Sequence, residues 1–158
     1  NNFLINLFPN LYKILPKILE KILNKKVIYK KNAFLPGFHI FFPNNIFNYN
    51  VAKFHIDRQQ YNNDIMNCNK DEVISFTLPI DLPKDISGLY IFDADKSYSK
   101  KEASKKNKAL IKYDIGKLYL HSGNQFHIMK PSKIGKDEYR ITLQGHGILC
   151  NNIWNIYW

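Results

Sequence analysis

The tripeptide His55-Ile56-Asp57 decides how the rest of this chain is interpreted. Side chains of an extended strand alternate between its two faces, so His55 and Asp57 are expected to point to the same side. An imidazole nitrogen and a carboxylate oxygen then lie next to each other on a rigid element. A histidine from a distant strand would complete a 2-His-1-carboxylate metal site. By itself the pair is a weak signal, because a surface salt bridge uses the same two residue types.

The sequence around this pair is typical of a β protein. Short runs rich in β-branched and aromatic residues alternate with Pro, Gly, Asn and Asp, a pattern that predicts many short strands. We expect strands near 27–30, 37–42, 51–57, 72–79, 88–93, 108–113, 117–121, 125–129, 138–145 and 147–157. In the run 72–79, Ser75 and Thr77 alternate with apolar residues, so one face of that strand is polar. Strands at this spacing predict a mainly β sandwich or jelly roll.

One helix is expected before the strands. Apolar residues between Leu11 and Leu23 recur with a helical period, and lysines occupy the other face, which predicts a helix over 11–24. Such a stripe could lie on a membrane, but packing against the core of its own domain is the commoner arrangement. A lysine-rich segment, 93–108, contains almost no apolar residue and predicts a solvated loop, with a mobile lid as the alternative.

Composition limits the possible classes of protein. The 158 residues carry a net charge of +10, but nearly all of the excess comes from lysine, so the charge is weak evidence for a nucleic-acid partner. No apolar run is long enough to cross a membrane and no signal peptide is visible. Two cysteines, Cys68 and Cys150, are expected to be free thiols in a reducing compartment, which predicts a cytoplasmic location. The first residue is Asn1 and not Met, so an upstream segment is compatible with the sequence.

Three motifs follow one another in the chain: His-x-Asp at 55–57, Gly-x-Leu-x-Leu at 116–120 leading through a turn to His127, and Arg-x-Thr at 140–142. Their types and order resemble those of the Fe(II)/2-oxoglutarate-dependent dioxygenase superfamily. The resemblance covers about residues 34–146 and implies a double-stranded β-helix, which is a cupin-like jelly roll of eight core strands. It does not identify a subfamily.

With this fold, the whole chain is expected to form one domain in three parts. These are an N-terminal supporting helix and edge strand over 1–33, the double-stranded β-helix over 34–146, and a C-terminal strand over 147–158.

The resemblance also implies a ligand set. His55, Asp57 and His127 would bind iron, with His127 preferred to His121 because the superfamily more often places this ligand after the turn. Arg140 would pair with the distal carboxylate of 2-oxoglutarate, since a guanidinium holds a carboxylate through two parallel hydrogen bonds in a way that lysine cannot.

Further candidates are weaker. Thr142 shares a face with Arg140 and could donate its hydroxyl to the same carboxylate, and Tyr90 could bind the cosubstrate or belong to the core. Residues that could contact a substrate are Arg58, Gln60, His39 and His146. For each of them a structural or solvated role is an open alternative.

The function that the resemblance implies is hydroxylation by an oxygenase that consumes Fe(II), 2-oxoglutarate and O2 and releases succinate and CO2. Two alternatives stay open. One is a cupin-like metal enzyme that does not use 2-oxoglutarate, and the other is a basic module that binds nucleic acid or an anionic surface. The substrate, whether small molecule, peptide or nucleic acid, and the oligomeric state are not encoded in any motif.

Overall fold

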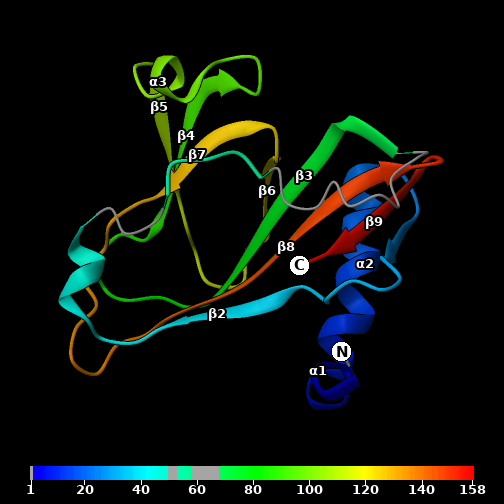
Figure 1. Ribbon diagram of the computed structural model, residues 1–158. Coiled ribbons are helices and arrows are strands. Elements are labelled where there is room, and N and C mark those ends of the chain that lie inside the picture. Colours follow the sequence, from blue (N-terminus) through cyan, green and yellow to red (C-terminus); the bar gives the residue numbers. More distant parts are fainter. Residues whose placement is uncertain (1, 50–52, 58–67) are drawn as a thin grey trace.

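The computed structural model describes residues 2–49, 53–57 and 68–158 (Figure 1). Arg58 and Gln60 lie outside the described residues, as do residues 51 and 52 of the expected strand 51–57. The helices are α1 (Asn2–Leu7), α2 (Pro9–Leu23), the 3-10 helix η1 (Asn45–Asn48) and α3 (Lys100–Ala103). The strands are β1 (Val27–Tyr29), β2 (Gly37–Phe41), β3 (Cys68–Asp81), β4 (Gly88–Asp95), β5 (Lys108–Lys112), β6 (Tyr119–Ser122), β7 (Gln125–Met129), β8 (Arg140–Cys150) and β9 (Ile153–Tyr157).

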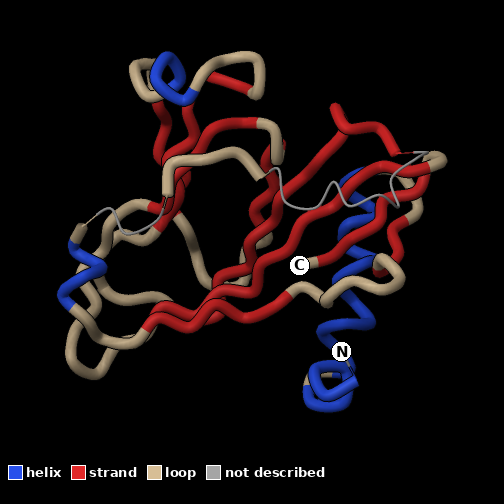
Figure 2. Tube along the Cα trace, viewed as in Figure 1, coloured by secondary structure: helices blue, strands red, loops and turns tan. Residues whose placement is uncertain are grey.

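The strands form two sheets that lie on opposite sides of a cavity. The larger sheet has the order β1-β9-β8-β3-β6, and β2 continues along the edge of β8 that β9 occupies further on. The smaller sheet has the order β5-β4-β7. Helix α2 covers the face of the larger sheet that is turned away from the smaller one, as Figure 2 shows. The expectation of a mainly β, jelly-roll-like chain with a supporting N-terminal helix is confirmed.

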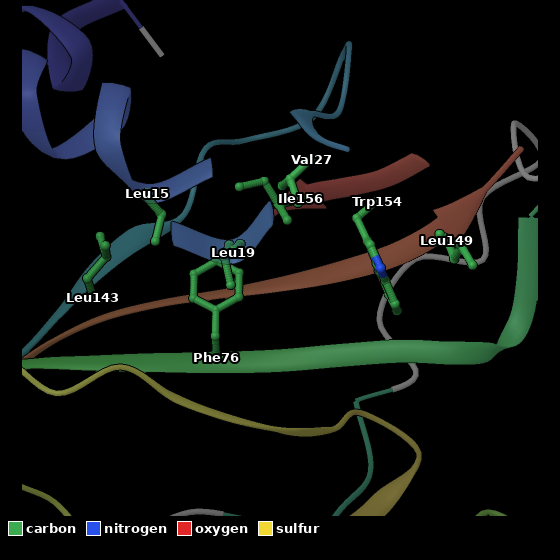
Figure 3. Packing of buried hydrophobic residues seen from close by; sticks show 8 residues of the cluster. All are labelled: Leu15, Leu19, Val27, Phe76, Leu143, Leu149, Trp154 and Ile156. Atoms are coloured by element: carbon green, nitrogen blue, oxygen red, sulfur yellow. The ribbon is translucent and has the colours of Figure 1, made fainter. Parts of the chain in front are cut away.

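The main core lies between α2 and the larger sheet (Figure 3). Leu15 and Leu19 point from the helix toward Phe76 of β3 and Leu143 of β8, and all four side chains are buried. The helix starts at Pro9, whose missing N–H costs nothing in a first turn, and ends at Asn24, which has the left-handed conformation common at helix C-termini. The amphipathic stripe therefore identified the helix but only part of its buried face, because Ile14, Ile18 and Ile22 of the stripe are exposed.

Alternation along β3 separates the core from the cavity. Phe76 points toward α2, whereas Ser75 and Thr77 on either side of it line the cavity between the sheets. The polar face expected for this strand therefore faces the interior of the barrel.

Two of the expected strands differ from what the chain forms. Within 53–57 only His55 makes a bridge, to His127, so His55 and Asp57 lie on an irregular segment and not on a strand. The expected strand 147–157 is divided, because Asn151 and Asn152 both have positive φ and close a two-residue hairpin between β8 and β9. Asparagine tolerates this conformation, so the Asn-Asn pair was a turn signal.

The lysine-rich segment 93–108 is only partly a loop. Its first residues extend β4, and α3 follows after a capping box in which Ser99 and Glu102 bond each other's backbone N–H groups. Ala103 of α3 is fully buried beside Phe92 and Phe126. The segment is largely exposed, as expected of a solvated loop, but its expected lack of regular structure was wrong. The Ser-x-x-Glu spacing was the signal for the helix.

The two cysteines are not free. Cys68 and Cys150 lie directly opposite each other in the β3–β8 register and form a disulfide, which contradicts the expected free thiols. They are 82 residues apart in sequence, so only the sheet register brings them together. No helix in the described ranges is long and apolar enough to cross a bilayer.

Gly145→Ala is expected to destabilise the fold by about 1–3 kcal/mol, the usual cost of overpacking a core. A Cβ at this position would lie 2.5 Å from Cζ of Phe76 and 2.9 Å from Cβ of Pro36. Gly37→Ala is the matched control, because the nearest atom to its added Cβ is 3.9 Å away. Urea denaturation of both variants measures the difference, and equal free energies of unfolding would contradict the prediction.

Candidate active site

The cavity between the two sheets has a volume of about 340 Å³. It receives side chains from both sheets and from the segment 53–57. All five histidines of the chain line it, although they are spread over more than a hundred positions of the sequence; they are His39, His55, His121, His127 and His146. A volume in this range is typical of sites for small ligands.

Backbone hydrogen bonds place the first two candidate ligands opposite each other. The N–H of His55 donates to the carbonyl of His127 at 3.1 Å, and the N–H of His127 donates to the carbonyl of His55 at 2.9 Å. Residues paired in this way project to the same face, and the two ring centres are 4.5 Å apart. The N–H of Asp57, two residues after His55, donates to the carbonyl of Gly123 at 2.8 Å. This bond fixes the backbone position of the third candidate ligand.

The three side chains converge on one point. Nε2 of His55 is 3.2 Å from Oδ1 of Asp57, and Nε2 of His127 is 3.5 Å from Oδ2 of the same carboxylate. One ligand atom from each residue lies within 4.8 Å of the other two. Adjacent ligands of an octahedral ion at about 2.1 Å are about 3 Å apart, so small side-chain movements would let all three bind one ion.

Each candidate histidine ligand is oriented through its second ring nitrogen. Nδ1 of His55 donates to the carbonyl of Lys53 at 2.5 Å, and Nδ1 of His127 donates to the carbonyl of Gln125 at 2.9 Å. In both cases the acceptor is the carbonyl two residues earlier. In the neutral ring, a proton on Nδ1 leaves the lone pair on Nε2, the atom that faces Asp57. Outer bonds of this kind orient metal-binding histidines.

The electrostatics of Asp57 and His127 favour the protonation states that a metal requires, whereas the hydrogen bond to Asp57 raises the pKa of His55, which must release a proton to bind a metal. Burial alone would raise the pKa of Asp57, but the hydrogen bond from His55 and the nearby His127, His146 and Ser75 outweigh it and hold the pKa well below its usual value. Burial lowers the pKa of His127 to about 4. At neutral pH the carboxylate is therefore ionised and His127 is neutral, as metal coordination needs.

Arg140 is a buried cation that has no anionic partner in the part of the chain that the structure describes. Only 3% of its surface is exposed, and Nε and Nη1 have no hydrogen-bond partner among the described residues. The guanidinium carbon lies 5.2 Å from the ring centre of Phe41 and 5.9 Å from that of Tyr113. Unpaired buried donors of a charged group cost free energy, so the site is built to receive an acceptor.

Other predicted site residues are divided between the cavity and the core. His39 and His146 line the cavity with Arg140. Thr142 is fully buried and accepts a hydrogen bond from Nε2 of Gln144 at 3.1 Å, but it is not among the described residues of the cavity wall. Tyr90 is likewise outside the wall; it packs against the cluster around Phe92 and lies under the Lys108 ammonium.

Three aromatic residues at the ends of strands contribute to the wall and were not predicted. Tyr113 follows β5 and is buried next to Arg140, Phe41 lies directly opposite Arg140 in the β2–β8 register, and Trp158 stacks on His146 with ring centres 5.5 Å apart. Aromatic residues at strand ends usually belong to the core, so no signal in the sequence separates these three from the other aromatics.

No protein-family model and no curated protein matches the sequence. Among solved structures, the chain is similar to an N-substituted L-amino acid dioxygenase from Burkholderia ambifaria AMMD in complex with alpha-KG, with 15% identity and a TM-score of 0.59 over 78% of this chain and 52% of that one. A second structure of that enzyme gives 14% identity and the same TM-score, over 78% and 53%. The chain thus spans about half the length of these neighbours. Similarity at this level establishes a dioxygenase-like fold.

The metal-free protein is expected to lose stability as the pH falls from 7 to 4.5. Burial lowers the pKa of His127 to about 4, and it also lowers those of His39, His121 and His146. Unfolded histidine takes up a proton near pH 6.5, so in this window the unfolded chain binds more protons and gains stability relative to the folded one. His127 alone corresponds to about 3 kcal/mol when its shift is fully expressed.

Urea denaturation in the presence of a chelator measures this dependence. The hydrogen bond to Asp57 raises the pKa of His55, so protonation of this residue stabilises the folded state as the pH falls. It opposes the effect of the four histidines whose pKa is lowered, which we expect to dominate. His127→Gln is the matched control and is expected to flatten the profile. A free energy of unfolding that is constant or higher at pH 4.5 would contradict the prediction.

Proposed function

We propose that this chain is an Fe(II)- and 2-oxoglutarate-dependent oxygenase that hydroxylates an unidentified substrate and releases succinate and CO2. The dioxygenase-like fold supports the proposal, and the similar Burkholderia enzyme is described in complex with alpha-KG. The likeness is at the level of the fold, so the argument for activity depends on the residues of the cavity.

The donor set fits ferrous iron. Two imidazole nitrogens and one carboxylate oxygen, from His55, His127 and Asp57, are the protein ligands of non-haem Fe(II) oxygenases, and they would leave three positions open. When bound together, Fe(II), 2-oxoglutarate and O2 supply an oxidant able to hydroxylate an unreactive C–H bond, with 2-oxoglutarate converted to succinate and CO2.

The single observation that supports 2-oxoglutarate as the cosubstrate is the buried guanidinium of Arg140, two of whose nitrogens lack a partner among the described residues. It lies in the same cavity as the three candidate ligands, and its free Nε and Nη1 can donate to a carboxylate. Charge-assisted hydrogen bonds of this kind are strong in a buried setting. A dicarboxylate that reaches from the ligands to Arg140 would satisfy both ends of the cavity, and 2-oxoglutarate is such a molecule.

The remaining wall suits chemistry that must exclude water. Phe41 and Tyr113 flank the guanidinium, and Leu89 and Met129 add apolar surface from the smaller sheet. Apolar walls would strengthen an ion pair between Arg140 and a bound carboxylate and would protect reactive species from solvent. The assignments of Thr142 and Tyr90 to the cosubstrate, and of His39 and His146 to the substrate, stay predictions.

Anaerobic titration calorimetry tests the proposal. Protein loaded with Fe(II) is expected to bind 2-oxoglutarate and its analogue N-oxalylglycine, and the metal-free protein is expected to bind either one much more weakly. A screen for succinate release with Fe(II), ascorbate and O2 then searches amino acids, peptides, nucleic acids and lipids for the substrate. Protein that binds metal but not 2-oxoglutarate would overturn the proposal and favour a cupin-like enzyme, and binding of neither would exclude both.

A further inference from the structure

One histidine of the cavity, His146, is connected to the candidate metal ligand Asp57 through a serine. Oγ of Ser75 lies 2.5 Å from Oδ2 of Asp57 and 3.0 Å from Nδ1 of His146. All three residues are buried. Ser75 of β3 and His146 of β8 are direct partners in the sheet register, so the larger sheet itself holds the serine and the histidine side by side.

The direction of the two hydrogen bonds follows from the charge of Asp57. An ionised carboxylate only accepts hydrogen bonds, so the single hydroxyl proton of Ser75 is donated to Oδ2. The serine oxygen must then accept from His146, which places the proton of that imidazole on Nδ1. Trp158 stacks on the ring with an interplanar angle of 22°, which restricts its rotation.

This chain of bonds makes the two oxygens of Asp57 unequal. Oδ2 accepts the bond from Ser75 and lies 3.5 Å from Nε2 of His127, whereas Oδ1 is not bonded to the serine and lies 3.2 Å from Nε2 of His55. A carboxylate held in this way offers one oxygen to a metal and not two. One-oxygen binding matters because a bidentate aspartate would take one of the three positions that the cosubstrate and O2 need.

We propose that Ser75 and His146 are positioning residues that hold Asp57 as a one-oxygen metal ligand. The inference rests on the proposed function, since it assigns a role to residues around the iron set of that same site. Neither residue is itself a ligand in the proposed set, and both would act on the metal through Asp57. Outer partners of metal ligands change metal affinity by roughly 10–100-fold when they are removed, which sets the expected size of the effect.

The test compares variants that remove the bonds with variants that keep them. Ser75→Ala and His146→Phe remove them, whereas Ser75→Thr keeps a hydroxyl and His146→Asn keeps an amide donor near the position of Nδ1. The readouts are the Co(II) affinity of the metal-free protein under anaerobic conditions and the visible spectrum of the Co(II) form, which reports coordination number. Thr77→Val, on the same face of β3 but without a bond to Asp57, is the matched control.

Ser75→Ala and His146→Phe are each expected to weaken Co(II) binding by roughly 10–100-fold and to change the spectrum, while Ser75→Thr, His146→Asn and Thr77→Val stay near the wild type. A folded removal variant with wild-type affinity and spectrum would overturn the inference. So would equal weakening in the conservative variants, because that points to general disturbance of the cavity. Two independent removal variants keep the test decisive if one of them fails to fold. Wild-type protein that binds no metal would refute the proposed function itself, a result distinct from either of these.

Discussion

Asp57→Ala is expected to abolish metal binding in the cavity and, with it, all turnover of 2-oxoglutarate. Asp57 is the only acidic residue among the described residues of the wall, so its loss removes the one anionic ligand and leaves a site with Arg140 and neutral histidines. The loss of metal affinity should well exceed the roughly 10–100-fold that removal of an outer-shell partner costs. Anaerobic calorimetry with Fe(II) and a succinate assay measure the two effects.

His121 provides the matched control for this prediction. Its ring centre lies 4.8 Å from that of His127 in the same cavity, but it is not part of the converging group. His127→Ala is expected to lose the metal as Asp57→Ala does, and His121→Ala is expected to keep it. The reverse result would show that His121 is the third ligand, and metal-dependent turnover by Asp57→Ala at the wild-type rate would refute the proposed function.

Arg140→Met is expected to remove 2-oxoglutarate binding while leaving Fe(II) binding intact. Truncating one partner of a buried, hydrogen-bonded charge pair costs about 2–5 kcal/mol, which corresponds to roughly 30-fold to several thousand-fold in affinity. Arg140→Lys keeps the charge but not the paired N–H donors, so an intermediate loss is expected. Calorimetry with 2-oxoglutarate on the Fe(II)-loaded wild type, Arg140→Lys and Arg140→Met measures the affinity of each, which is expected to fall in that order.

The same substitution is expected to stabilise the ligand-free fold or leave its stability unchanged. Arg140 is buried with unpaired donors, and replacing such a group by an apolar side chain of similar length removes a desolvation cost. Lost 2-oxoglutarate binding together with an unchanged or higher stability of the ligand-free protein is the result expected for a residue whose role is to bind a ligand. If Arg140→Met bound 2-oxoglutarate as the wild type does, or unfolded far more easily without ligand, the guanidinium would have a structural role and not a binding one.

Local patterns were sufficient for much of the fold. The helical period between Leu11 and Leu23 identified α2 and part of its buried face. The alternation around Ser75 and Thr77 identified the face of β3 that lines the cavity. Other features were missed although a local signal existed, namely the Asn151-Asn152 turn and the Ser99–Glu102 capping box. At both places turn and cap chemistry, and not hydrophobic period, decides the local structure.

The sequence by itself determined the element types and the residue types available for a site, because side-chain period and turn preference are properties of neighbouring residues. It also singled out His55, Asp57, His127 and Arg140, which the fold brings into one cavity. Only the tertiary structure decided the rest. Sheet register joins Cys68 to Cys150 and His146 to Ser75, and it places Phe41 against Arg140. Register depends on how distant strands pair, so contacts across the sheet leave no trace in any short stretch of the chain.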